Sequence, residues 1–357
     1  MCISFYPLSY AMPQYYDAQE FVSLAKNSLI FDVRSPQEYA QGHIPQALNL
    51  PLLNNAEREA VGTCYAREGK KAAVEKALTL IGGQLADKLR QAHSFAAEGG
   101  EVYMYCWRGG MRSASMAWLL ETGGLNVHLL RGGYKAYRSL VRRDLAAGGQ
   151  VHVLGGMTGS GKTDILLAMR AQGAQVIDLE GLACHRGSVF GGLGMAPQPH
   201  SEMMENLLHQ AWRALDFSRP VWVEDESRRI GNVSLCNEFF AHIEQGALVT
   251  ISIPRPARVH RLVAMYTAGG ASPSQDAQLV HAIALLEKRL GNALCRQCQL
   301  AVQQGDYAAA VAGLLNYYDK GYQHALARKP QAPELELVCE SDNPLATANK
   351  LLALYPA

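Results

Sequence analysis

An apolar run near the middle of the chain leads directly into a glycine-rich loop: Val151-His152-Val153-Leu154-Gly155-Gly156-Met157-Thr158-Gly159-Ser160-Gly161-Lys162-Thr163. From residue 156 onward the loop has the spacing G-x-x-x-x-G-K-T, and residues 164–171 are compatible with a helix. A strand, this loop and a helix in that order make a phosphate-binding P-loop, whose glycines expose backbone N–H groups to phosphate oxygens. The lysine neutralises the terminal phosphates, and the threonine can hold magnesium. The residues that we expect to bind a diphosphate or triphosphate are Gly156, Thr158, Gly159, Ser160, Gly161, Lys162 and Thr163.

Apolar runs alternate with helical patterns on both sides of this loop, which predicts parallel sheets covered by helices. The strands that we expect lie at 29–33, 47–50, 102–105, 127–130, 151–154, 175–179, 220–223 and 248–253. Residues 54–97 are too long for a simple loop and rich in Ala, Lys and Glu, so we expect inserted helices there. A helical pattern runs from 274 to about 327.

A short segment of small residues, Ala146-Ala147-Gly148-Gly149-Gln150, separates a charged helix end from the next strand. Such a segment is typical of a domain boundary. We therefore predict one domain over 1–145, with its helical insertion near 54–97, and a second over 150–357. A total of 357 residues also suits two domains better than one.

The composition excludes several classes of protein. Thirty-three Lys and Arg against 32 Asp and Glu give a net charge of +1, so the chain is no broadly basic nucleic-acid coat and any RNA contact must be local. No apolar stretch approaches the ~18 residues of a membrane span, and the first 16 residues lack the pattern of a signal peptide. We expect a cytoplasmic protein without membrane partners. Its eight cysteines lack the density of a disulfide scaffold, so free thiols are expected.

A second loop of chemical interest follows the expected strand 102–105: Cys106-Trp107-Arg108-Gly109-Gly110-Met111-Arg112-Ser113. A thiol at a strand-to-helix turn faces unpaired N–H groups and the positive end of the helix dipole. Arg108 and Arg112 add positive charge, and together these effects favour thiolate over thiol. Gly109 and Gly110 let backbone N–H groups turn toward a bound oxyanion. We predict a reactive Cys106 in an anion-binding loop; a buried structural cysteine is the alternative.

Other features give weaker signals. Glu224 and Asp225 end an apolar run and are our candidates for assisting a metal or phosphate, although acids also cap helices. Cys295 and Cys298 have the spacing of a zinc half-site without a second pair, which favours incidental thiols.

Cations gather at three places in the sequence. The first set is Arg131, Lys135, Arg138, Arg142 and Arg143, the second is Arg255, Arg258, His260 and Arg261, and the third is Arg228 and Arg229. The first set follows one helical face from Arg131, at i+4, i+7 and i+11. Such clusters could neutralise an RNA backbone, and an ordinary solvated surface is the alternative.

The first half of the chain resembles the rhodanese family over about residues 15–144. The resemblance is carried by Phe31-Asp32-Val33-Arg34-Ser35-Pro36-Gln37-Glu38-Tyr39-Ala40-Gln41-Gly42-His43-Ile44-Pro45-Gln46-Ala47-Leu48-Asn49-Leu50-Pro51 and by Leu130-Arg131-Gly132-Gly133-Tyr134. It implies a loop cysteine that carries a persulfide, braced by Asp32 and Arg34. Arg112 stands six positions after Cys106, which is the C-x5-R spacing of tyrosine phosphatases, and this keeps a phosphatase open as an alternative.

A rhodanese-like parallel-sheet domain followed by a P-loop NTPase-like α/β domain with a helical C-terminal part resembles the bacterial tRNA 2-selenouridine synthases. Residues 61–65, 178–191 and 224–228 add to this resemblance. It implies that the sulfur of the wobble 2-thiouridine in tRNA is alkylated by geranyl diphosphate, and that selenium from selenophosphate then displaces the S-geranyl group. It implies no tightly bound cofactor, with Mg2+ as a candidate ion, and leaves the oligomeric state open, a monomer included.

This resemblance also assigns roles to residues. Cys106 attacks or orients the selenium donor, while Arg108 and Arg112 bind its phosphate. Lys162 and Thr163 bind geranyl diphosphate. Further candidates are Cys64 as a resolving thiol, and His185 and Arg186 in a loop that closes over the diphosphate or a flipped uridine. The alternatives are a nucleotide-dependent sulfurtransferase, a phosphatase acting through its thiol, and a tRNA-binding protein without catalysis.

Overall fold

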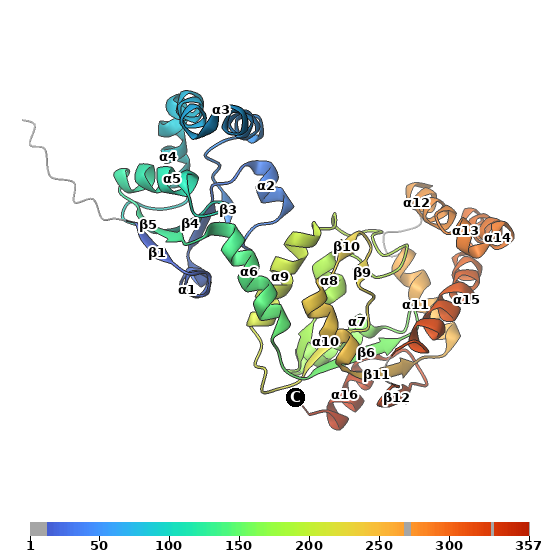
Figure 1. Ribbon diagram of the computed structural model, residues 1–357. Helices are drawn as coiled ribbons and strands as arrows, with labels where there is room; N and C mark the ends of the chain where they lie inside the picture. The colour runs from blue at the N-terminus through green and yellow to red at the C-terminus, as the bar shows by residue number, and fades with distance from the viewer. Residues whose placement is uncertain (1–12, 268–272, 330–331, 357) are drawn as a thin grey trace, which may run out of the picture. The chain divides into compact units, whose positions relative to one another are not determined.

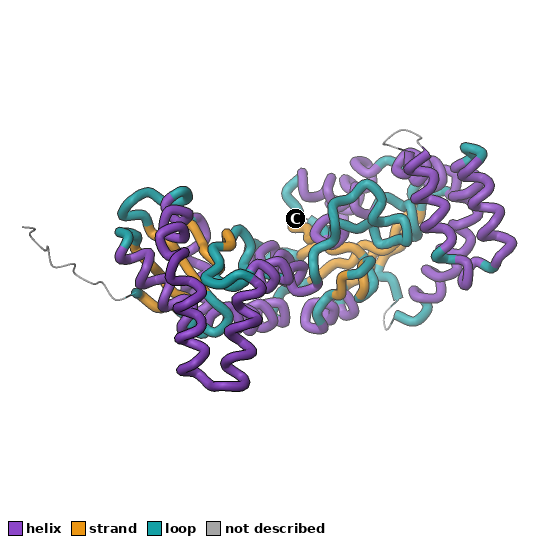
Figure 2. The backbone as a smooth tube through the Cα atoms, turned by 90° about the horizontal axis from the view of Figure 1, so that it is seen from above, coloured by secondary structure: helices purple, strands orange, loops and turns teal. Residues whose placement is uncertain are grey.

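The computed structural model describes residues 13–267, 273–329 and 332–356, and the predicted α/β fold is confirmed. The chain separates into two units, Met1–Arg143 and Asp144–Ala357 (Figure 1). Figure 2 shows the strands of each unit enclosed by helices and loops. None of the described helices combines the length and the apolar character that crossing a membrane requires.

The first unit contains a parallel sheet of five strands in the order β1-β5-β4-β2-β3. Its strands are β1 (Gln14–Tyr16), β2 (Leu29–Asp32), β3 (Leu48–Asn49), β4 (Glu101–Tyr105) and β5 (Asn126–Leu130). Its helices are α1 (Ala18–Leu24), α2 (Pro36–Gln41), α3 (Asn55–Ile81), α4 (Leu85–His93), α5 (Met111–Thr122) and α6 (Gly133–Ala146). The edge strand β1 is not apparent from the sequence, because its three residues are mostly exposed and carry little apolar signal.

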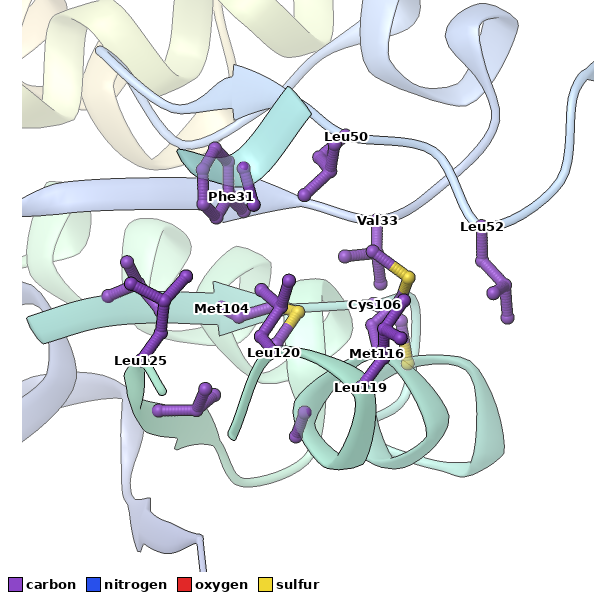
Figure 3. Close-up of a cluster of buried hydrophobic side chains, with 14 of the residues drawn as sticks. Phe31, Val33, Leu50, Leu52, Met104, Cys106, Met116, Leu119, Leu120 and Leu125 are labelled. Atoms are coloured by element: carbon purple, nitrogen blue, oxygen red, sulfur yellow. The ribbon is translucent and has the colours of Figure 1, made fainter. Parts of the chain in front are cut away.

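The core of the first unit lies between its central strands and α5 (Figure 3). Phe31 of β2 and Met104 of β4 are completely buried, and so are Met116 and Leu120 of α5. Strands in the middle of a parallel sheet are covered on both faces and therefore consist of near-continuous apolar residues. This is why the sequence predicts β2 and β4 well.

The second unit contains another parallel five-stranded sheet, in the order β12-β11-β6-β8-β7, and a small antiparallel pair. Its strands are β6 (Val151–Gly156), β7 (Gln175–Ile177), β8 (Val221–Glu224), β9 (Arg229–Ile230), β10 (Val233–Ser234), β11 (Ala247–Ser252) and β12 (Leu335–Val338). The strand expected at 175–179 ends at Ile177, because the Asp178 side chain accepts a hydrogen bond from Gly181 N and starts a helix. The edge strand β12 is not among the strands that we expect from the sequence. Alternate residues of this strand are exposed.

Helices surround this sheet and form a separate helical part. The helices next to the sheet are α7 (Lys162–Ala171), α8 (Leu179–Ala183), α9 (Ser201–Arg213), α10 (Asn237–Gln245), α11 (Arg255–Thr267) and α16 (Pro344–Leu354). The others are α12 (Pro273–Ala284), α13 (Glu287–Leu290), α14 (Asn292–Gln303) and α15 (Tyr307–Leu326), as the helical pattern from 274 to about 327 predicts. Helices α11, α12, α14 and α15 share an apolar core of their own.

Both motif loops occupy equivalent positions in their sheets. From β2 the chain adds β3 on one side and then β4 on the other. From β6 it adds β7 and β8 on one side and then β11 on the other. Ligands of open parallel sheets bind at the carboxyl ends of the strands where the order reverses in this way. The loops after β4 and β6, which begin at Cys106 and Met157, leave from such points.

Candidate functional site

Cys106 lies directly after β4, at the base of the loop that leads into α5. Its Sγ lies 3.2 Å from Ser113 Oγ and 4.0 Å from the carbonyl oxygen of Gly110. The residue is only 3% exposed and belongs to the same apolar core as Val33 and Met116 (Figure 3). The thiol thus stands at the predicted strand-to-helix turn, but it is covered in this conformation, so a donor has to displace part of the loop to reach it.

The start of α6 holds the backbone of this loop. Tyr134 N donates to the carbonyl of Cys106 at 2.8 Å, and Lys135 N donates to that of Trp107 at 3.0 Å. A Cβ on Gly133 would stand 2.3 Å from the Cys106 carbonyl oxygen, so only glycine allows this approach. The geometry of the thiol loop therefore depends on a turn that follows β5, more than twenty residues further along the chain.

The two loop arginines have different environments. Arg112 donates to both carboxylate oxygens of Glu38, at 2.7 and 3.4 Å. Burial alone would raise the pKa of Glu38, but the hydrogen bond and charge of Arg112 lower it below its ordinary value. Arg108 is exposed, and no ion pair with it occurs among the described residues. An incoming phosphate therefore meets Arg108 freely and has to compete with Glu38 for Arg112.

The two loop glycines also differ. Gly109 has φ +64° and packs against the turn after β5, where a Cβ would stand 2.8 Å from the Leu130 carbonyl oxygen. Gly110 faces open space, because a Cβ there would meet nothing within 4 Å. Gly109 shapes the loop, while Gly110 leaves room in front of it.

A buried ion pair supports the loop from β2. Asp32 and Arg34 are both almost inaccessible, with Nη2 and Oδ2 2.6 Å apart. Arg34 Nη2 also donates to the carbonyl of Gly42, and its guanidinium carbon lies 3.8 Å from the centre of the Tyr134 ring. These contacts satisfy the buried charge. They correspond to the bracing role that the rhodanese resemblance implies.

Cys64 is buried in α3. Burial and the neighbouring Glu68 carboxylate raise the pKa of its thiol. Both effects disfavour the thiolate in this conformation. The role of Cys64 as a resolving thiol stays a prediction.

The P-loop joins β6 to α7 in the second unit. Gly159 and Gly161 have φ values of +80° and +75°, which glycine adopts without strain. Lys162 Nζ donates to the carbonyl of Gly156 at 3.2 Å, so the ammonium group lies over its own loop. Ser160 Oγ is buried and has no hydrogen-bond partner within the described chain. The loop thus presents an ammonium group and open backbone N–H groups to an anion.

A cavity of about 380 Å³ opens in front of this loop. Its lining includes the whole predicted P-loop set, from Gly156 to Thr163, together with Arg186. Apolar and aromatic side chains also line it, which are Met195, Leu262, Met265, Tyr266, Tyr318 and Tyr322. These come mainly from α11 and α15. We call these six residues the apolar wall.

Carboxylates also face this cavity. Thr163 Oγ1 donates to Glu180 Oε2 at 2.9 Å, and Glu226 lies beside Glu180. Burial raises the pKa of Glu226 to about 8, and the negative charge of Glu180 adds to this effect. The positive charge of Lys162 lowers the pKa, but only in part compensates for the increase. Burial likewise raises the pKa of Glu180. At neutral pH the pair therefore retains a proton, which reduces its repulsion of an anionic ligand.

The structure corrects the predicted acidic pair. Glu224 ends β8, is fully buried and accepts a hydrogen bond from Leu179 N at 2.8 Å, and it does not line the cavity. Asp225 does line it, but forms an ion pair with Lys329. Because the strand extends through Glu224 and holds that side chain inside the unit, Glu226 supplies the cavity carboxylate that we expected from Glu224.

The 178–191 segment contributes in part as expected. Arg186 faces the cavity, together with Gly187 and Ser188. His185 does not line it: its ring lies against Gly191 and Gly231, and burial lowers its pKa. His185 therefore packs the segment, and Arg186 is the residue of this pair that can reach a ligand.

Two family models match the chain. Residues 17–140 match the rhodanese-like domain, and residues 149–336 match the tRNA 2-selenouridine synthase AAA domain. The second match alone spans more than half of the chain. The chain belongs to the tRNA 2-selenouridine synthase family.

Relatives named tRNA 2-selenouridine synthase match across both units. The relative from Marinobacter nauticus is 33% identical over 344 residues, covering 88% of this chain and 92% of its own length. The one from Shewanella sediminis is 34% identical and covers 84% and 88%. That from Cupriavidus pinatubonensis is 39% identical over 250 residues and covers 68% and 67%.

Several cavity residues of this synthase family member escape the sequence analysis. Glu180 and Glu226 lie within runs that carry the resemblance, at 178–191 and 224–228, but nothing in those runs singles them out. The three cavity tyrosines, Tyr266, Tyr318 and Tyr322, lie on helices whose pattern indicates only burial. A search for carboxylates within three residues of an expected strand end would have found Glu226.

Proposed function

We propose that this chain converts the wobble 2-thiouridine of tRNA to 2-selenouridine through an S-geranylated intermediate, acting as a transferase on tRNA. In the first step the 2-thio sulfur forms a bond to C1 of geranyl diphosphate, the C1–O bond breaks, and diphosphate leaves with the electron pair while the base loses its N3 proton. In the second, selenium from selenophosphate bonds to C2 and geranyl thiolate leaves. Water then takes the phosphoryl group, which gives 2-selenouridine, geranyl thiol and phosphate.

One observation carries this proposal: a single cavity combines a P-loop with the apolar wall. A diphosphate joined to a hydrocarbon chain likewise combines a charged part with an apolar part. Lys162 and the loop N–H groups would bind the diphosphate and stabilise the charge that develops when it leaves. The tyrosines and methionines would cover the chain, where burial of apolar surface contributes about 25 cal/mol per Å². Hydrolysis of a nucleotide is not required.

The fold also implies magnesium, and the cavity residues fit this ion. The Thr163 hydroxyl and the Glu180 and Glu226 carboxylates supply the oxygen ligands that Mg2+ prefers. Among the described residues, no three His, Cys, Asp or Glu side chains could hold a metal by themselves. Such a site would therefore depend on phosphate oxygens and water, and the bound ion would supply charge that stabilises the leaving diphosphate.

We assign the second step to the Cys106 loop. Arg108 is free to bind the phosphate of selenophosphate. Arg112 would provide a second contact when the phosphate replaces the Glu38 carboxylate at its guanidinium group. The thiol lies at the base of this anion site, where it would orient the selenium atom toward C2 of the nucleobase. The buried Asp32–Arg34 pair keeps the base of the loop in place meanwhile.

The proposal is tested by mass spectrometry of the wobble nucleoside from 2-thiouridine tRNA incubated with the protein. With geranyl diphosphate and selenophosphate together we expect 2-selenouridine, and with geranyl diphosphate alone the S-geranyl nucleoside. Conversion that needs no geranyl diphosphate, or that needs ATP or GTP turnover, would instead support a nucleotide-dependent transferase. Release of phosphate from aryl phosphates without RNA would favour the phosphatase alternative.

A further inference from the structure

Helix α6 and the turn before it carry a concentration of positive charge. From residue 131 to residue 143 the chain contains five cations, Arg131, Lys135, Arg138, Arg142 and Arg143, and no Asp or Glu. The whole chain is nearly neutral, with 33 basic and 32 acidic residues. A local excess of this kind is where a polyanion would bind a protein that has no general basic character.

The cations and the apolar residues lie on different faces of α6. Tyr134, Tyr137 and Val141 are buried in the unit, whereas Arg131, Lys135 and Arg142 are exposed. Lys135 and Arg142 follow helical spacing, at i and i+7, and at a rise of 1.5 Å per residue they lie about 10 Å apart along the helix. Arg131 precedes the helix, in the turn that contains Gly132 and Gly133 with their positive φ values, so it does not continue the helical face that the sequence predicts. We call these three residues the α6 basic face.

These cations are available to a ligand. The Arg131 guanidinium donates to the carbonyl of Tyr15 at 3.3 Å, and no described carboxylate pairs with Lys135 or Arg142. The apolar side chains of the helix are used inside the unit, so the basic face has no exposed hydrophobic stripe with which to enter a membrane. A hydrophilic polyanion fits this surface better than a lipid bilayer.

The basic face begins at the thiol loop. The first turn of α6 donates backbone hydrogen bonds to the carbonyls of Cys106 and Trp107, and Arg108 is exposed on the same loop. A phosphodiester backbone lying along α6 therefore passes directly to the loop that we assign to the second step. Helix and loop belong to one unit and keep their relation as a single folded element.

We infer that the α6 basic face binds the phosphate backbone of the tRNA substrate and leads it to the Cys106 loop. This inference rests on the proposed function for its partner, and adds the surface that binds it. Phosphate contacts of this kind position an RNA without reading its sequence. The face should consequently contribute affinity and orientation, and leave the choice of tRNA to other parts of the protein.

The test is the salt dependence of tRNA binding by the full-length protein. The double variant Lys135→Gln with Arg142→Gln removes two exposed charges without disturbing the core. We expect the Kd for tRNA to rise on the order of 10-fold at low salt, and the slope of log Kd against log salt to fall by about 2. A matched control changes two exposed lysines of α3, Lys70→Gln with Lys71→Gln, and should bind tRNA like the wild type.

The outcomes separate this inference from the proposed function. If the wild type binds tRNA and the α6 double variant binds it with equal affinity and equal slope, the inference is wrong and the proposed function stands. If the wild type does not bind tRNA, the proposed function fails. Binding of pyrophosphate should be unchanged in the α6 variant. Loss of binding to phosphatidylserine vesicles with unchanged tRNA binding would mean that this face binds a membrane, and would overturn the inference.

Discussion

A single carboxyl group, that of Glu226, should control how the P-loop cavity responds to pH. Its pKa is raised to about 8, so it is protonated at pH 7 and ionised at pH 9. Ionisation places a negative charge beside the diphosphate, so binding weakens as the pH rises through 8. Without divalent cations, we expect the Kd of pyrophosphate to rise by up to about tenfold per pH unit above this value.

The control for this prediction is Glu226→Gln, which keeps a neutral side chain at every pH. Titration calorimetry from pH 6.5 to 9 should show a much flatter profile for this variant. Any residual slope belongs to the ligand, which ionises in the same way in both experiments, and to the neighbouring Glu180, whose pKa burial also raises. Identical profiles for the two proteins would show that Glu226 does not titrate next to the diphosphate.

A second effect at the scale of residues concerns stability. Arg34→Met leaves the Asp32 carboxylate buried without its partner, and loss of one member of a buried pair costs about 3–5 kcal/mol. We expect a loss of this size in the free energy of unfolding of the first unit, measured by urea denaturation. The exposed pair of Arg90 and Asp87 provides the control, because Arg90→Met should change stability little. Equal effects of the two substitutions would contradict the bracing role of Arg34.

At the scale of elements, the turn into α6 should tolerate no side chain. Gly133 has φ +60°, and a Cβ would stand 2.4 Å from the backbone nitrogen of Gly109. Gly133→Ala should therefore distort the thiol loop and reduce selenium transfer more than geranylation. Gly83→Ala, which lies outside the thiol loop and where a Cβ also meets nothing within 4 Å, is the matched control for overall folding. Equal selenium transfer by both variants would show that this turn does not shape the loop.

Helix α15 should recognise the hydrocarbon part of the donor. Tyr318→Ala and Tyr322→Ala remove cavity surface that a hydrocarbon chain would cover. We expect each to weaken binding of geranyl diphosphate by roughly ten- to a hundredfold, as the loss of about 1.5–3 kcal/mol of burial implies. Binding of inorganic pyrophosphate should be unchanged. Parallel losses for both ligands would mean that the tyrosines support the P-loop and do not bind the chain.

The sequence predicts the elements of this molecule better than it predicts their side-chain contacts. The central strands β2, β4, β6 and β11 are near-continuous apolar runs, whereas the short edge strands β1 and β12 depend on a neighbour that no local pattern reveals. The P-loop follows from spacing alone. The pairing of Arg112 with Glu38 joins residues 74 positions apart, so the sequence gives no sign that one loop cation is already bound.

The cavity illustrates the same limit. Glu226 replaces Glu224 in the cavity because strand ends are uncertain by a few residues from sequence. The apolar wall combines residues of α11, α15 and a loop, and only the tertiary fold brings them in front of the P-loop. The burial of the Cys106 thiol also results from tertiary packing. The loop sequence indicates a reactive site, but it does not show how far the core encloses the thiol.

At the scale of the whole molecule, we assign the two proposed chemical steps to two folded units. Each unit has its own parallel sheet, and each motif loop leaves its sheet where the strand order reverses. A substitution in one loop should therefore leave the fold and chemistry of the other unit intact. On this proposal the S-geranyl nucleoside would be an intermediate that one unit makes and the other consumes.

The most direct measurement is the identity of the wobble nucleoside that accumulates when each loop is disabled separately. Tandem mass spectrometry would be applied to tRNA incubated with both co-substrates and either Cys106→Ala or Lys162→Ala. We predict that Cys106→Ala accumulates the S-geranyl nucleoside, whereas Lys162→Ala leaves 2-thiouridine unchanged. The same nucleoside in both reactions would contradict the assignment of one step to each unit.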